Sequence, residues 1–139
     1  MRSARVDSWF VVLMVLGVLN LGNGAWMLAD PAGWYQNLPA AVPHTGPLNE
    51  HFVRDIGSVF VMMAVALAWA ALSPPARLPL VAMVALFQVL HALVHVVDTL
   101  RGRLPAAHWG IDFPGVYLPA LFAVALTGLL VRRPPRAAF

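Results

Sequence analysis

Four long apolar stretches limit what this chain can fold into. They run from about 9 to 28, 52 to 72, 78 to 100 and 114 to 131. A bilayer core of about 30 Å is crossed by an α-helix of roughly 20 apolar residues. Of the whole chain, 60% of residues are hydrophobic and only 11% are charged, against about 25% charged in soluble domains. We therefore predict an all-α, four-helix transmembrane bundle in which residues 1–139 form one integral domain surrounded by lipid.

The arginines predict how this bundle is oriented. All nine basic residues are arginines, and they gather at segment ends without forming a basic stripe, which argues against nucleic acid as a partner. Loops on the cytoplasmic side of a membrane carry the excess of Lys and Arg, so six arginines against three predict that both termini are cytoplasmic. The six are Arg2, Arg5, Arg77, Arg132, Arg133 and Arg136, and the three on the outer side are Arg54, Arg101 and Arg103.

The third span carries a polar stripe that lipid alone does not explain. Its members are Gln88, His91, His95 and Asp98, and at about 100° per residue they fall within an arc of about 80°. At about 1.5 Å of rise per residue, His91 lies near the membrane midplane and Asp98 close to the outer surface. Ionisable groups within spans are costly and usually face the bundle interior or a water-filled cavity. We therefore expect this stripe to face inward.

The first two spans add polar residues at matching depths. His51 and Asp55 are four residues apart at the start of span two and share a helix face. Asn20 and Asn23 lie in the outer half of span one, and Arg54 lies on the flank of span two. All five histidines fall in the outer half or the outer loops, so the pattern predicts a polar chamber that opens outward above an apolar base.

Imidazole and carboxylate groups in one chamber suggest a transition-metal site. The preferred ligands are His51, Asp55, His91 and His95, with Asp98 as a further ligand or as a group that orients a histidine ring. The residue types do not separate zinc, iron and copper, and no cysteine is present to supply a thiolate. This hypothesis requires the side chains of His51 and Asp55 to meet those of His95 and Asp98. Arg54 would be an ion-pair partner or an anion contact.

Two alternatives remain open at this stage. A haem b group could bind between axial histidines on different helices, with His51 opposite His91 or His95. Alternatively, the histidines, Gln88, Asn20 and Asn23 could form a purely structural hydrogen-bond network. The chain would then be an accessory or assembly subunit of another membrane protein, or form a homo-oligomer. No phosphate-binding loop is present, and the sequence leaves open whether the protein is an enzyme.

One sequence pattern resembles a known group of proteins. It reads G-P-x-N-x-H-x-x-R-D-x-G followed by H-x-x-x-H-x-x-D. The chain resembles, over nearly its whole length, small bacterial four-span membrane proteins of DoxX-like layout. This resemblance implies a four-helix layout in the bacterial inner membrane, and it brings no activity with it. The matching positions are Gly46, Pro47, Asn49, His51, Arg54, Asp55 and Gly57, then His91, His95 and Asp98.

The predicted orientation can be tested with a reporter fused after Phe139. Because six arginines flank the side that carries both termini, an enzyme active only in the cytoplasm should be active in this fusion. A second reporter active only in the periplasm, fused at the same residue, should be silent. Activity of the second reporter in place of the first would reverse the orientation.

Overall fold

The computed structural model describes residues 7–132 and contains only helices and their connections in that range. Four helices are long, and five shorter segments connect them. The long helices are α1 (Ser8–Ala29), α3 (Glu50–Leu72), α4 (Arg77–Leu100) and α6 (Leu118–Arg132). The short segments are α2 (Pro31–Asn37), η1 (Val42–Thr45), η2 (Pro74–Ala76), α5 (His108–Ile111) and the π-helical η3 (Phe113–Tyr117).

The predicted four-span bundle is confirmed. Four helical segments are long and apolar enough to cross a membrane, namely Ser8–Ala29, Glu50–Leu72, Pro74–Leu100 and Phe113–Arg132. Their ends lie within a few residues of the predicted ones. The last span reaches 20 residues because the π-helical turn η3 continues directly into α6. Pro114 lies in this turn, and prolines and π-turns are the usual sites where a helix departs from regular geometry.

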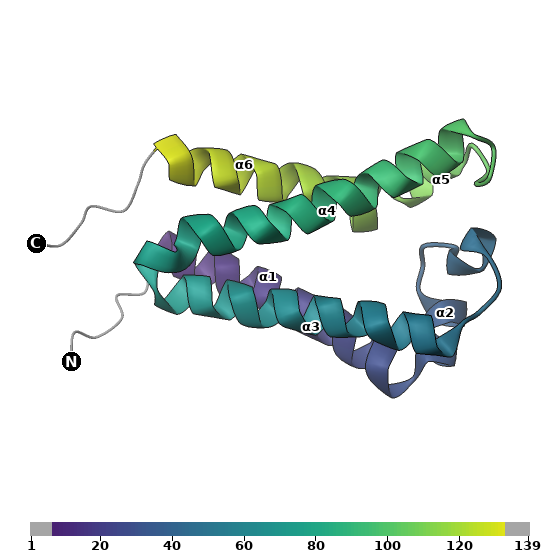
Figure 1. Ribbon diagram of the computed structural model, residues 1–139, viewed down its shortest axis with the longest axis horizontal. Helices are drawn as coiled ribbons and strands as arrows, with labels where there is room; N and C mark the ends of the chain where they lie inside the picture. The colour runs from purple at the N-terminus through teal and green to yellow at the C-terminus, as the bar shows by residue number, and fades with distance from the viewer. Residues whose placement is uncertain (1–6, 133–139) are drawn as a thin grey trace, which may run out of the picture.

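The long helices form two pairs (Figure 1). Helix α1 packs along α3, and α4 packs along α6, with α3 and α4 joined by the short turn η2. We call the end of the bundle that carries η2 the turn end, and the end that carries α2, η1 and α5 the loop end. The start of α1 and the end of α6 both lie at the turn end. The two pairs lie further apart at the loop end than at the turn end.

The apolar core fills the turn-end half. Its members come from the start of α1, the end of α3, the start of α4 and the end of α6, so all four long helices meet there. Helices in lipid associate through close van der Waals packing, because the lipid tails are as apolar as the side chains. The buried members are Leu13, Met63, Leu67, Ala70, Ala71, Val81, Val84, Leu126 and Leu130.

Two glycines let α1 and α3 approach closely in the loop-end half. A Cβ atom on Gly24 would lie only 2.7 Å from the carbonyl oxygen of Gly57. A Cβ atom on Gly57 would lie 2.8 Å from the Cβ of Met27. Small residues at such crossings are typical of membrane helices, because backbones can then touch. Helices α1 and α3 are therefore in close contact at this crossing, which leaves no room for a pocket between their backbones there.

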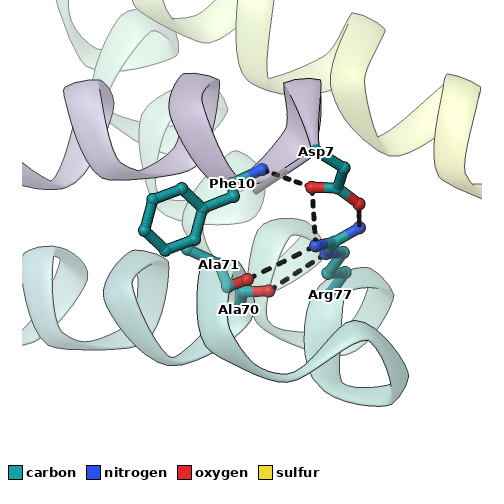
Figure 2. Close-up of polar contacts among 5 residues, drawn as sticks. All are labelled: Asp7, Phe10, Ala70, Ala71 and Arg77. Atoms are coloured by element: carbon teal, nitrogen blue, oxygen red, sulfur yellow. Dashed lines mark hydrogen bonds and ion pairs between the residues drawn. The ribbon is translucent and has the colours of Figure 1, made fainter. Parts of the chain in front are cut away.

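A buried arginine holds the turn end together (Figure 2). The Arg77 guanidinium donates two hydrogen bonds to the Asp7 carboxylate, at 2.7 and 3.0 Å, and others to the carbonyl oxygens of Ala70 and Ala71. Arg77 is only 5% exposed. Asp7 also accepts a hydrogen bond from the Phe10 amide and so caps α1. One carboxylate thereby fixes the start of α1 against the end of α3 and the start of α4.

Removing this carboxylate should destabilise the protein. Asp7→Asn leaves the buried Arg77 without a counter-charge, and we expect a loss of about 1–3 kcal/mol in the free energy of unfolding. Thermal denaturation in a mild detergent measures the change. Glu50→Gln is the matched control, because the Glu50–Arg54 pair is exposed and such pairs contribute about 0–1 kcal/mol. Equal losses in the two variants would contradict the role of Asp7.

The same pair predicts a dependence on pH. The hydrogen bond from Arg77 holds the pKa of Asp7 below its ordinary value of 3.8. Because the folded-state pKa is the lower one, the ion pair stabilises the protein fully above the ordinary pKa. This contribution is lost as pH falls below about 4 through the folded-state pKa. The Asp7→Asn variant should lack that part of the acid dependence.

Candidate functional site

A pocket of about 600 Å³ occupies the loop-end half of the bundle. Side chains from α1 and α3 line one side, and side chains from α4, η3 and the start of α6 line the other. Residues of α2, η1 and the segment that follows them cover the loop end. Most of the lining is apolar. The pocket therefore lies between the two helix pairs, above the apolar core.

Three hydrogen bonds hold this cover in place. Asp30 accepts a bond from the Gly33 amide and starts α2, with Pro31 as its first residue. The Trp34 indole donates to Asn23 Oδ1 at 2.9 Å, which fastens α2 to α1. The buried Tyr35 hydroxyl donates to the Gly46 carbonyl oxygen at 2.6 Å. The segment from α2 to η1 thus folds back over the pocket.

Helix α4 supplies a polar wall. Gln88, His91 and His95 all line the pocket, and Gln88 is only 6% exposed. The His91 ring stacks on Phe87, with ring centroids 5.9 Å apart, and meets the His95 ring edge to face at 4.8 Å. The stripe on span three therefore faces inward over these three residues, and aromatic contacts fix the two imidazoles.

Asp112, which comes directly after α5, joins this polar wall to the loop end. Its side chain is only 1% exposed, and each of its carboxylate oxygens has a histidine partner. His95 Nδ1 lies 2.8 Å from Oδ2, and His108 Nδ1 lies 3.0 Å from Oδ1. His108 is fully buried, and its Nε2 lies 3.1 Å from Nδ1 of His44 on η1. A chain of hydrogen bonds therefore runs from an exposed loop residue to the pocket.

This geometry assigns a proton position to each ring. An ionised carboxylate only accepts hydrogen bonds, so His95 and His108 each donate to Asp112 through Nδ1–H. The Nε2 atom of neutral His108 then accepts, and His44 donates to it through its own Nδ1–H. With Nδ1 protonated, Nε2 of neutral His95 keeps a free lone pair. The carboxylate thus sets the orientation and the tautomer of the histidine that lines the pocket.

Besides Nε2 of His95, the side-chain oxygen of Asn20 lacks a hydrogen-bond partner in the pocket. Asn20 lines the pocket from α1, and its Nδ2 donates to the Leu16 carbonyl oxygen at 2.8 Å. Its Oδ1 is buried and has no hydrogen-bond partner. A buried acceptor without a donor costs about 1–3 kcal/mol, so such an atom in a pocket marks a position where a bound molecule gains a contact. Asn23, also in the lining, is already occupied by Trp34.

The structure does not bring span two and span three together as the metal hypothesis requires. The side chains of His51 and Asp55 are 88% and 59% exposed, lie 3.5 Å from each other and are not part of the pocket lining. The expected meeting with His95 and Asp98 is therefore wrong. The physical reason is that the face shared by His51 and Asp55 points away from α4. Asp98 pairs with Arg103 at the surface instead.

Arg54 also lies outside the pocket. It pairs with Glu50 at 2.9 Å on the exposed side of α3. Among residues 7–132, no group of three or more His, Asp or Glu side chains is arranged to hold a metal ion. Metal and haem binding therefore stay predictions of the sequence. The pocket does contain His91, His95, Gln88, Asn20 and Asn23 from the predicted set.

Three residues of the network were not among the predicted site residues, namely His44, His108 and Asp112. His108 and Asp112 share the four-residue spacing that drew attention to His51 and Asp55. The sequence therefore held a signal for this pair. It did not show that the loop before η3 folds into a short helix that turns both side chains toward α4.

Comparisons with known proteins give no relative: the chain matches no protein-family model, no curated protein and no solved structure. The resemblance to small four-span bacterial membrane proteins therefore stays a prediction.

Replacing the central carboxylate should destabilise the protein. Asp112→Asn keeps the size of the side chain but leaves one of two buried ring N–H groups without an acceptor. We expect a loss of about 1–3 kcal/mol in the free energy of unfolding, measured by thermal denaturation in detergent. Asp98→Asn is the control at the same end of the bundle, because its partner Arg103 is 65% exposed. If both variants melt like the wild type, Asp112 does not organise the site.

Proposed function

We propose that this protein binds a small amphipathic molecule inside the membrane, in the pocket between its two helix pairs. The observation that carries the proposal is the pocket of about 600 Å³, with an apolar lining and one polar wall. Ligand sites are typically concave, mostly apolar and about 300–1,000 Å³ in volume, with a few polar groups that orient the ligand. Pockets between the helices of a bundle are a common place for such sites.

The depth of the pocket supports a ligand that dissolves in lipid. Its walls come from the membrane-spanning parts of α1, α3, α4 and the last span, so a molecule in the bilayer shares its level. The apolar body of the ligand would lie against side chains such as Leu16, Phe60 and Val116. Its polar head would lie against Gln88, His91 and His95. Asp112 would act as a positioning residue, because it holds His95 and does not itself need to touch the ligand.

Location and orientation complete the proposal. We propose that the turn end faces the cytoplasm and that the loop end lies on the outer side of the bacterial inner membrane, which the arginine distribution supports. The pocket would then open toward the outer half of the bilayer. His44, on the exposed segment η1, would lie at the outer surface.

A transition-metal ion is a second candidate for the same pocket. The observation in its favour is the hydrogen bond between Asp112 and His95, because metal-binding histidines usually donate their other ring N–H to a carboxylate. Nε2 of His95 and a nitrogen of His91 would be the ligands that the chain supplies. Elemental analysis with an optical spectrum of the purified protein separates the cases: stoichiometric metal supports the ion, and a Soret band supports haem b.

Filling the pocket should weaken binding of a neutral fluorescent probe. Gly115 lines the pocket, and nothing lies within 4 Å of a Cβ built on it, so Gly115→Trp places an indole in the open space. N-phenyl-1-naphthylamine, measured by fluorescence in lipid nanodiscs, should bind the wild type and lose at least about tenfold in affinity in this variant, since several apolar contacts are lost.

Gly128→Trp is the matched control for this experiment. Gly128 lies on the same span with equally open space around its Cβ, but outside the pocket. This variant should bind the probe like the wild type. Equal binding by all three proteins would mean that the probe partitions only into lipid, and it would contradict a binding pocket at Gly115.

A further inference from the structure

We infer that the ligand of this pocket is an uncharged molecule whose head group carries a hydroxyl. The inference rests on the proposed function and adds the chemical class of the ligand. It comes from the charges and from the free hydrogen-bonding atoms of the lining. These do not suit the head group of an anionic lipid, a cationic amphiphile or an ester.

The charges of the pocket disfavour an anionic head. Asp112 is the one Asp, Glu, Lys or Arg side chain in the lining. Arg54 pairs with Glu50, and Arg77 binds Asp7 at the far end of the bundle. No arginine among residues 7–132 lines the pocket, so a carboxylate or phosphate there would lie near Asp112 without a cation to balance it. Buried charges without a partner are strongly unfavourable in such surroundings.

A cationic head group also finds no free carboxylate oxygen in the pocket. The Asp112 side chain is 1% exposed, and both its oxygens already accept hydrogen bonds from His95 and His108. A ligand ammonium group would have to displace one of these rings to reach the carboxylate. Displacement would break the chain that continues to His44. The network leaves a neutral head as the one that fits without rearrangement.

The free atoms of the lining require a donor on the ligand. Asn20 Oδ1 is an acceptor without a partner, and Nε2 of His95 is an acceptor in the neutral ring, whose one proton is on Nδ1 and is donated to Asp112. A ketone, ether or ester offers only acceptors and leaves both atoms unpaired. A hydroxyl donates to one of them and can also accept from the amide of Gln88, which lines the same pocket.

Four compounds with a chain of twelve carbons test this inference by displacing N-phenyl-1-naphthylamine from the wild type in nanodiscs. They are 1-dodecanol, 1-methoxydodecane, dodecanoate and dodecylamine, which differ only in the head. Because one neutral hydrogen bond to a buried acceptor contributes about 1 kcal/mol, 1-dodecanol should displace the probe at about three- to tenfold lower concentration than 1-methoxydodecane. The two charged compounds should be weaker than 1-dodecanol.

Asn20→Leu controls for unequal partition of these compounds into lipid. Leucine is close to asparagine in size but offers no acceptor, so the advantage of 1-dodecanol over 1-methoxydodecane should shrink by about threefold. The advantage is the ratio of the two displacing concentrations within one protein, so a change in the affinity of the probe itself does not enter it. The empty protein should melt at the same or a higher temperature, because an unpaired buried acceptor is gone. A purely structural role for Asn20 would instead lower the melting temperature and leave the advantage unchanged.

The outcomes distinguish failure of the hydroxyl inference from failure of the proposed binding pocket. If the probe binds and Gly115→Trp weakens its binding, but dodecanoate, dodecylamine or 1-methoxydodecane displaces it as well as 1-dodecanol does, the hydroxyl inference is wrong and the pocket stands. If probe binding does not depend on Gly115, the proposed function and the inference both fail.

Discussion

The buried carboxylate of Asp112 is the constraint around which the loop end is built. A carboxylate at 1% exposure is tolerated only if donors satisfy its oxygens, because an unpaired buried charge is far too costly. His95 from α4 and His108 from α5 supply those donors, and His44 from η1 extends the chain across to the other helix pair. The need to satisfy this buried charge therefore joins η1 to α4 and α5.

The bundle is held at its two ends by different polar interactions. At the turn end, Arg77 joins α1, α3 and α4 through Asp7 and two carbonyl oxygens, and the apolar core packs beside it. At the loop end, the network around Asp112 joins α4 to the cover of the pocket. Between these ends, α1 and α3 are kept in contact by Gly24 and Gly57. The pocket lies between the two pairs, where they diverge toward the loop end (Figure 1).

The sequence predicted the four spans because hydropathy and helix length are local properties that the bilayer imposes. It also placed Gln88, His91 and His95 on an inward face, since helical periodicity fixes which residues share a face. It could not predict that His51 and Asp55 face outward, because the rotation of α3 depends on the contact between Gly24 and Gly57. Nor could it place Asp112, whose position depends on the irregular backbone of α5 and η3.

The central claim is that an ionised Asp112 accepts from His95 and His108 and thereby sets the tautomer of the ring that faces the pocket. Nitrogen-15 spectra of the histidine side chains, with each ring assigned by substitution, test it most directly. The account predicts that His44, His95 and His108 all carry their proton on Nδ1. An Nε2-protonated tautomer with a bare Nδ1 at His95 or His108 would contradict it, because that ring could not donate to the carboxylate.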